Sequence, residues 1–347
     1  MNEYFAVIKT FFLAALAFAV TMAWTPLLTH FLYKYKLGKA IRNNGQTPVY
    51  SRLHADKAGT PTMGGLLVWV TVLVLALAFY YLAKFVNWEI FRQLNFLTRS
   101  ETLLPLGVLV ASAIIGLFDD LADIKGLGKG GLRMRHRFLI YALIAGVGVW
   151  WFYYKLDWDL LHVPFVGNFE LGWWYIPAFI FIIVATAHSV NLIDGLDGLA
   201  GGTLLTAFAA FGAIAFAQGR YNLAAFCGVI AGALAAFLWF NINPARFFMG
   251  DTGAMSLGVT LGVIAMLTNT ALLLPVIGFL FMITSLSVII QWISKKIRHR
   301  KIFVSAPLHH HLEAKGWPET KIVMRYWVIA GITAAVGVAL ALIDKSF

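Results

Sequence analysis

Apolar residues fall in ten stretches along the chain, each long enough to cross a lipid bilayer. A spanning helix needs about 20 mostly apolar residues. The predicted spans lie near residues 5–30, 64–86, 103–118, 138–154, 174–190, 199–217, 222–240, 254–270, 272–293 and 326–343. The break between the eighth and ninth spans rests mainly on Asn269 and Pro275. The pattern predicts an all-α polytopic membrane protein.

No repeat, low-complexity stretch or linker interrupts these spans, so residues 1–347 are expected to form a single integral-membrane domain. The composition agrees, because 60% of the residues are hydrophobic and only 12% are charged, whereas soluble domains carry about 25% charged residues. The first apolar run lacks a basic start and is longer than the core of a secretory signal, so we expect it to remain as the first span.

The basic residues lie in alternate loops. Of the 27 Lys and Arg residues, 20 lie in the loops 31–60, 121–137, 191–198, 241–253 and 295–325. The positive-inside rule makes these loops cytoplasmic and leaves both termini outside. The net charge of +11 therefore reflects membrane topology, and no nucleic-acid partner is expected. The polar motifs of the chain also lie on this side, which predicts one active site facing the cytoplasm.

Three acidic motifs lie at the predicted cytoplasmic edge. Asp119 and Asp120 end a long apolar run, and adjacent carboxylates need a cation or a raised pKa of one of them. The run NLIDGLDGLAGG (191–202) alternates Asp and Gly but lacks the spacing and closing Glu of an EF-hand. In the run NPARFFMGDTG (243–253), Asp251 lies at a helix entry, where free backbone N–H groups favour phosphate. A solvated helix end and a structural turn are the plainer interpretations of the first two motifs.

Two further motifs contain candidate phosphate ligands. In the run APLHHHLE (306–313), three consecutive histidines cannot all face one metal from a helix or strand, so they do not predict a zinc site. Their imidazoles could donate to phosphate oxygens or hold the loop in place, and both interpretations remain open. His54, outside this run, is interpreted as an ordinary basic-loop residue. The turn KAGTPTMGG (57–65) resembles a phosphate-handling turn but lacks the spacing of a P-loop, which disfavours ATP hydrolysis.

Together these motifs describe a site for a hard cation with oxygen ligands and abundant phosphate donors. Mg²⁺ typically binds through one or two carboxylates plus substrate phosphates. Phosphoryl-type transfer needs positioning and charge neutralisation more than covalent work by the protein. At a membrane edge, a soluble anionic donor and a lipid phosphate are the natural substrates.

Five motifs in order carry a resemblance over nearly the whole chain. They are KAGTPTMGG (57–65), FDD (118–120), NLIDGLDGLAGG (191–202), NPARFFMGDTGAMSLG (243–258) and APLHHHLEAKGW (306–317). They resemble the phospho-N-acetylmuramoyl-pentapeptide-transferase family of the polyprenyl-phosphate N-acetylhexosamine-1-phosphate transferase superfamily. The resemblance implies a Mg²⁺-dependent transfer of phospho-MurNAc-pentapeptide from UDP-MurNAc-pentapeptide to undecaprenyl phosphate, which forms lipid I and releases UMP. It also implies a homodimer in the bacterial inner membrane.

The resemblance assigns roles to matching residues. Asp251 is the expected Mg²⁺ ligand, with Asp119, Asp120 and Asp194 as further candidates, and one Asp of the adjacent pair would deprotonate or position the lipid phosphate. The triple-His loop would lie near the pyrophosphate and complete the catalytic set with His309, His310 and His311. The remaining matches imply a substrate-binding set, with the ring of Phe248 stacking on uracil: Lys57, Thr62, Arg137, Asn191, Asp194, Gly195, Leu196, Asp197, Phe248 and Gln291. At position 137 relatives commonly have Lys.

Several alternatives stay open at the sequence level. The lipid phosphate could attack the donor directly, which is our hypothesis, or the reaction could pass through an aspartyl-phosphate intermediate. A sister enzyme that moves GlcNAc-1-phosphate from UDP-GlcNAc to a polyprenyl phosphate would share the Asp motifs, although the triple-His loop favours the muramoyl donor. A transporter without chemistry is disfavoured, because transporters place ionisable residues near the bilayer midplane. The pair Gly228 and Gly232 could pack helices closely, and it is weak evidence for a dimer seam.

Overall fold

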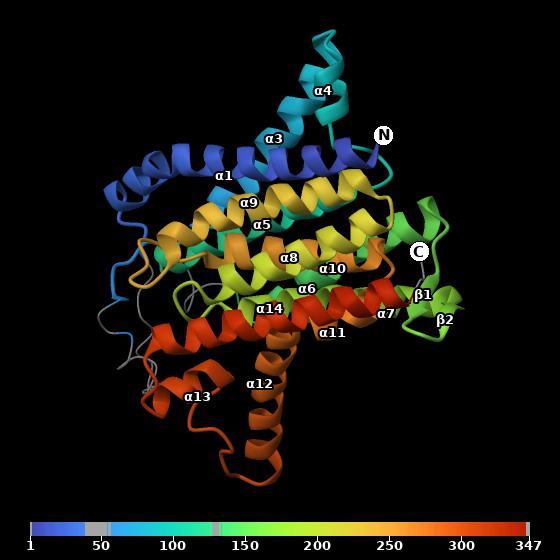
Figure 1. The fold of residues 1–347 in the computed structure, drawn as a ribbon. Helices are drawn as coiled ribbons and strands as arrows, with labels where there is room; N and C mark the ends of the chain where they lie inside the picture. The colour runs from blue at the N-terminus through green and yellow to red at the C-terminus, as the bar shows by residue number, and fades with distance from the viewer. Residues whose placement is uncertain (1, 39–53, 55–56, 127–131, 133, 345–347) are drawn as a thin grey trace.

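The computed structural model describes residues 2–38, 54, 57–126, 132 and 134–344. Long helices dominate it, as Figure 1 shows. The helices are α1 (Glu3–Lys34), α3 (Leu66–Phe85), α4 (Glu89–Leu94), α5 (Leu103–Ile124), α6 (Met134–Trp150), α7 (Tyr175–Ile193), α8 (Leu199–Ala217), α9 (Tyr221–Asn241), α10 (Gly250–Leu267), α11 (Leu274–Ile277), α12 (Phe279–Ile297), α13 (Leu308–Ala314) and α14 (Glu319–Ile343). A π-helical turn (Trp151–Lys155) extends α6, and 3-10 turns (Gly172–Trp174 and Ala271–Leu273) precede α7 and α11.

The prediction of ten membrane-spanning helices is confirmed. Ten helices of the described chain are long and apolar enough to cross a bilayer, and the predicted ranges overlap all of them. The ninth span begins at Phe279, later than the predicted residue 272, because the short helix α11 and its preceding 3-10 turn occupy residues 271–277. The chain is therefore a multi-pass membrane protein.

A short β-hairpin between the fourth and fifth spans is an element that the hydrophobic pattern did not predict. Strands β1 (Leu160–Val163) and β2 (Gly167–Glu170) pair antiparallel, with Leu160 opposite Glu170. The strands are only four residues each, too short for a clear alternation of apolar and polar positions. The hairpin lies at the same end of the bundle as the two termini in Figure 1.

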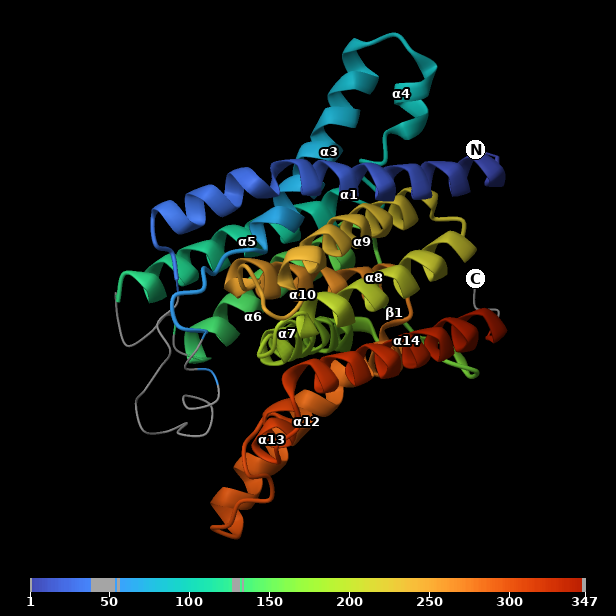
Figure 2. The same cartoon turned by 60° about the vertical axis from the view of Figure 1, so that its left-hand side comes forward.

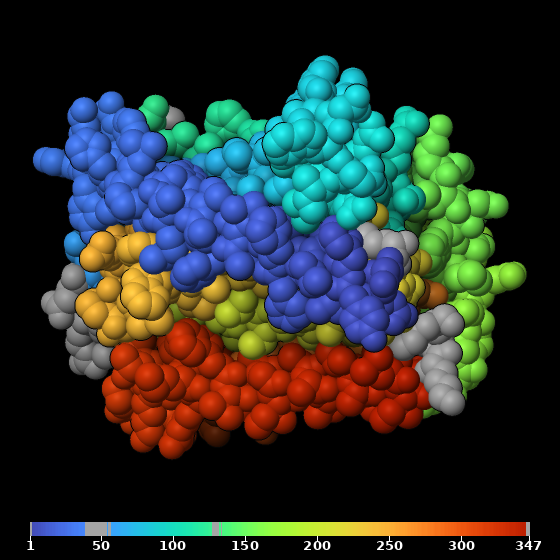
Figure 3. Space-filling view, turned by 45° about the horizontal axis from the view of Figure 1, so that its top comes forward, coloured from blue at the N-terminus to red at the C-terminus, as the bar shows by residue number. Residues whose placement is uncertain are grey.

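Helix α10 is the centre of the bundle. All 18 of its residues are buried, and it packs between α5 and α7. Small residues permit this close approach, since a Cβ at Gly258 would come within 2.8 Å of the Ala187 Cα atom in α7. In contrast, α1 and α14 have 28% of their apolar windows buried and lie along the surface, where Figure 3 shows them in blue and red.

The Gly228–Gly232 pair packs two helices of the same chain closely, as the sequence suggested, and it gives no evidence for a dimer seam. A Cβ at Gly232 would lie 2.0 Å from the backbone oxygen of Ala14, and one at Gly228 would lie 3.2 Å from Thr10. The glycines thus let α1 lie directly on α9. Helix α12 projects from the bundle at a clear angle to α14, with α13 beside it, as Figures 1 and 2 show.

Candidate active site

Four helices bring polar side chains together at the end of the bundle opposite the termini. Asp119 (α5) and Asp251 (α10) each place an Oδ2 atom 2.7 Å from the same Nη2 atom of Arg137 (α6). Asn191 (α7) completes the group, because its Nδ2 donates to Asp251 at 2.7 Å and its Oδ1 accepts from Arg137 Nη1 at 3.1 Å. We call Asp119, Arg137, Asn191 and Asp251 the carboxylate cluster. The two carboxylates come from segments more than a hundred residues apart and share one cation.

The carboxylate of Asp120 faces the start of α10, and this arrangement corrects one expectation about that helix start. Its two carboxylate oxygens accept hydrogen bonds from the backbone N–H groups of Asp251 and Thr252, both at 3.0 Å. Asp120 therefore caps the beginning of α10, and a carboxylate suits the positive end of the helix. The expectation that free backbone N–H groups at this helix entry would favour phosphate is wrong for these two groups. Thr62 lies beside the same helix start, since a Cβ at Gly250 would be 2.7 Å from its hydroxyl oxygen.

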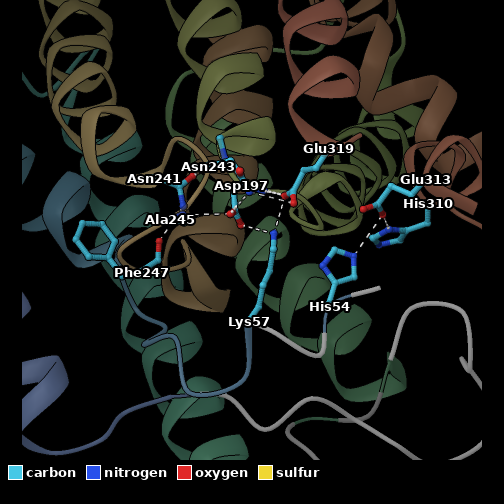
Figure 4. Close-up of polar contacts among 11 residues, drawn as sticks. His54, Lys57, Asp197, Asn241, Asn243, Ala245, Phe247, His310, Glu313 and Glu319 are labelled. Carbon is cyan, nitrogen blue, oxygen red and sulfur yellow. Dashed lines mark hydrogen bonds and ion pairs between the residues drawn. The ribbon is translucent and has the colours of Figure 1, made fainter. Parts of the chain in front are cut away.

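A second network surrounds Lys57, and Figure 4 shows it. Lys57 Nζ donates to Asp197 and to Glu319, both at 2.6 Å, and Asn243 donates to the same two carboxylates at 2.9 and 3.2 Å. We call Lys57, Asp197, Asn243 and Glu319 the Lys57 network. Burial alone would lower the pKa of Lys57, but the hydrogen bonds to Asp197 and Glu319 outweigh burial and raise it. Lys57 Nζ also lies 5.9 Å from the ring centre of Phe248.

The turn between α7 and α8 contains the Asp-Gly motif. Asp194 ends α7 as its C-terminal cap, and Gly198 begins α8 with a φ of 79°, a left-handed conformation that glycine adopts readily. Between them Leu196 is buried, and Asp197 belongs to the Lys57 network. The motif is therefore a bent connection between two helices. It places the Asp197 carboxylate at Lys57, and Asn191 of the carboxylate cluster lies in the last turn of α7 just before it.

The triple-His loop lies against this turn. A Cβ at Gly195 would be 2.6 Å from His309 Nε2 and 2.9 Å from His310 Nε2. His309 is fully buried, and neither of its ring nitrogens has a hydrogen-bond partner among the described residues. Burial, with a smaller contribution from His310, lowers the pKa of His309 well below its usual range, so the ring is neutral.

His311 and Gln291 have a different environment. His311 Nδ1 accepts the backbone N–H of Val304 at 3.1 Å. The Gln291 side-chain oxygen accepts the N–H groups of Ile302 and Phe303, both at 3.0 Å, and its amide donates to the Phe303 carbonyl at 2.8 Å. Both side chains thus hold the loop that leads to α13.

His54 is not the ordinary basic-loop residue expected from the sequence. It is 3% exposed, and its Nε2 donates to Glu313 Oε2 at 3.3 Å, while His310 Nδ1 donates to the same oxygen at 2.6 Å. Sequence reasoning also gave no role to Glu313 or to Glu319. In the sequence, Glu313 is visible only as a carboxylate beside the triple-His loop, and Glu319 only as one in the first turn of the last span. The tertiary structure is needed to show which basic side chains they contact.

In the part of the chain that the structure describes, we consider two groups of side chains as candidate cation sites. The carboxylate cluster offers hard oxygen ligands of the kind that Mg²⁺ prefers. His54, His310 and Glu313 offer nitrogen and oxygen atoms within 4.8 Å of one another, a set that suits zinc in composition. In the second group, however, both imidazoles already donate to one carboxylate oxygen.

The fold and the carboxylate cluster define a multi-pass membrane protein with a buried polar centre at one end of its bundle. Residues 102–269 match the family model described as glycosyl transferase family 4, and residues 57–67 match signature 1 of phospho-N-acetylmuramoyl-pentapeptide-transferase. The chain is similar to proteins of that name from Chloroflexus aggregans (40% identical, 97% of this chain and 91% of the relative), Rubrobacter xylanophilus (38%, 93% and 94%) and Geobacillus thermodenitrificans (37%, 93% and 95%). The chain belongs to the phospho-N-acetylmuramoyl-pentapeptide-transferase family and is a transferase.

Proposed function

We propose that this chain transfers phospho-MurNAc-pentapeptide from UDP-MurNAc-pentapeptide to undecaprenyl phosphate at the cytoplasmic face of the bacterial inner membrane. The products are lipid I and UMP. Family membership supports the reaction, and the names of its relatives favour it over the GlcNAc-1-phosphate alternative. The observation that carries the proposal is the meeting of Asp119 and Asp251 on one cationic group, with Asn191 beside them.

The carboxylate cluster fits Mg²⁺ by the chemistry of its donors. Two carboxylate oxygens from different helices already flank one positive group, the Arg137 guanidinium. Asp251 would hold the ion, with Asp119 as a further carboxylate ligand. When bound, Mg²⁺ supplies positive charge that neutralises the pyrophosphate of the donor.

The lipid phosphate is the nucleophile in this proposal. One of its oxygens attacks the β-phosphorus of the donor, the bond from that phosphorus to the bridging oxygen breaks, and UMP leaves. Asp119 is the member of the adjacent pair that positions or deprotonates the lipid phosphate, because Asp120 uses both of its oxygens to cap α10. Arg137 has a buried Nε–H without a hydrogen-bond partner among the described residues, which makes it a donor for a phosphate oxygen.

The Lys57 network is the proposed binding site for the uracil end of the donor. Asp197 and Lys57 hold each other in fixed positions, and Lys57 also faces the ring of Phe248, the proposed stacking partner of the base. Such preorganisation reduces the entropy lost on binding. His309 and His310 would meet the diphosphate, because both Nε2 atoms face the turn that contains Gly195.

The remaining expectations stand as parts of this proposal. Residues 1–347 act as one domain, the protein works as a homodimer in the bilayer, and both termini lie outside. The lysines and arginines of the loops at the site end support this orientation.

UMP release by the purified protein tests the function. We expect release with UDP-MurNAc-pentapeptide and undecaprenyl phosphate, no release when either is omitted, and loss of release when Mg²⁺ is chelated. The matched control is Glu170→Gln, which changes an exposed carboxylate on the hairpin at the opposite end and should leave release unchanged. Release from UDP-GlcNAc in place of the muramoyl donor would contradict the proposed substrate.

A further inference from the structure

Glu313 joins two loops of the candidate site. It lies in α13, one turn after His310, whose Nδ1 donates to Glu313 Oε2 at 2.6 Å. His54 comes from the segment that precedes Lys57 and donates to the same oxygen at 3.3 Å. The side chains of His54, Glu313 and His310 are only 4%, 7% and 12% exposed. Figure 4 shows the three side chains pointing toward one another.

This carboxylate stays ionised although it is buried. Burial alone would raise the pKa of Glu313, but the hydrogen bonds from His310 and His54 outweigh burial and hold it at about 2. A buried carboxylate that accepts from two imidazoles is a fixed negative charge. Such a charge determines which ring nitrogen of each partner carries the proton.

The contact with Glu313 also determines where the opposite edge of His310 points. Because Nδ1 faces Glu313, Nε2 faces Gly195, where a Cβ would lie 2.9 Å away. His309 packs against the same ring with 4.3 Å between ring centres and directs its own Nε2 to the same glycine. The two packed imidazoles therefore place both Nε2 atoms at the turn that carries the Asp-Gly motif.

We propose that Glu313 is a positioning residue that fixes the tautomer and orientation of His310, with His54 as a second anchor, so that His310 Nε2 meets a diphosphate oxygen of the nucleotide-sugar donor. The inference rests on the proposed function and deepens it. At metal sites, removing a carboxylate that orients a ligating imidazole changes activity by about tenfold to hundredfold, and we expect the same scale for His310. Glu313 touches no substrate in this scheme and acts only through His310.

A double-mutant cycle with Glu313→Gln and His310→Ala tests the proposal. Glu313→Gln keeps the shape of the side chain and removes its charge, so we expect kcat to fall about tenfold to hundredfold and KM for the donor to change less. In the His310→Ala background, the same change should lower kcat by less than about twofold, because the two residues act as a unit. Equal losses in both backgrounds would overturn the proposal, since they would make Glu313 a purely structural residue.

Two further variants keep the proposal testable if His310→Ala does not fold. His54→Gln retains an amide donor where Nε2 lies and should keep activity within about twofold of wild type, whereas His54→Leu should lose about threefold to tenfold in kcat. Equal activity of these two variants would contradict the second anchor. Glu170→Gln is the control for a Glu to Gln change.

Three outcomes separate this inference from its alternatives. If wild-type protein releases no UMP from the donor, the proposed function fails and the inference fails with it. If wild type is active and the cycle is additive, only the inference fails. Loss of wild-type activity on a zinc-selective chelator, with Mg²⁺ kept saturating, would also overturn it, because it would assign His54, His310 and Glu313 to a metal.

Discussion

Two buried histidines at opposite ends of the bundle have opposite environments. His162, on the hairpin, uses both ring nitrogens, with Nδ1 2.8 Å from Asn168 Oδ1 and Nε2 2.6 Å from Asp344 Oδ2. His309, in α13, uses neither nitrogen among the described residues, although it is even less exposed. A buried polar group without a partner costs free energy, whereas a paired one stabilises the fold. The comparison supports the proposal that the α13 end holds a ligand, whereas the hydrogen bonds of His162 stabilise the hairpin end.

The largest expected effect is at Asp251. Asp251→Ala removes the carboxylate that Arg137 and Asn191 both contact. We expect UMP release to fall by at least about a hundredfold, the scale of losing one electrostatic group in an active site. The matched change at the hairpin end, Asp344→Ala, should leave the rate within about twofold and lower the thermal midpoint instead. Near-normal turnover by Asp251→Ala would count against the metal assignment and against the comparison.

The histidines themselves give the sharpest contrast. His309→Leu loses no observed hydrogen bond, so we expect unchanged thermal stability and a fall in kcat of about tenfold to hundredfold. His162→Leu removes the buried hydrogen bonds that join the imidazole to Asp344 and Asn168, and it should cost about 1–3 kcal/mol in the free energy of unfolding, with kcat retained. Thermal unfolding and UMP release on the two variants measure both quantities. A stability loss in His309→Leu equal to that in His162→Leu would remove the distinction.

The adjacent aspartates separate stability from activity within the site end. Asp120→Asn weakens the cap of α10 and should lower the free energy of unfolding by about 0.5–2 kcal/mol. Asp119→Asn removes a ligand candidate of the carboxylate cluster and should reduce UMP release more than it reduces stability. The reverse ranking of the two variants would show that Asp120, rather than Asp119, faces the substrates.

The smallest effect concerns acid. Because the folded-state pKa of Glu313 is about 2, below its ordinary value of 4.5, the carboxylate stabilises the fold fully above that ordinary value. The stabilisation is lost as pH falls toward about 2. The difference in thermal midpoint between wild type and Glu313→Gln should therefore be larger at about pH 6 than at about pH 3. A difference that does not change with pH would contradict an ionised Glu313.

The sequence predicted the spans well because hydrophobic length alone decides whether a helix crosses a bilayer. It could not rank Asp119 against Asp120, since neighbouring residues on a helix point about 100° apart and only the packing of α5 on α10 decides which one faces the cluster. It also gave no role to Glu313 and Glu319. Two of their partners, His54 and Lys57, lie more than 250 residues earlier in the chain, and one sequence without tertiary structure does not show such distant contacts.

The cap on α10 has a consequence for how this protein can change over generations. A phosphate-binding site made of backbone amides can be altered only by moving the backbone. Here Asp120 occupies the amides of Asp251 and Thr252, so in the proposed mechanism the donor is held by side chains such as Arg137 and His310. Single codon changes at those positions can strengthen or relax the hold on the donor while the frame of the bundle stays the same.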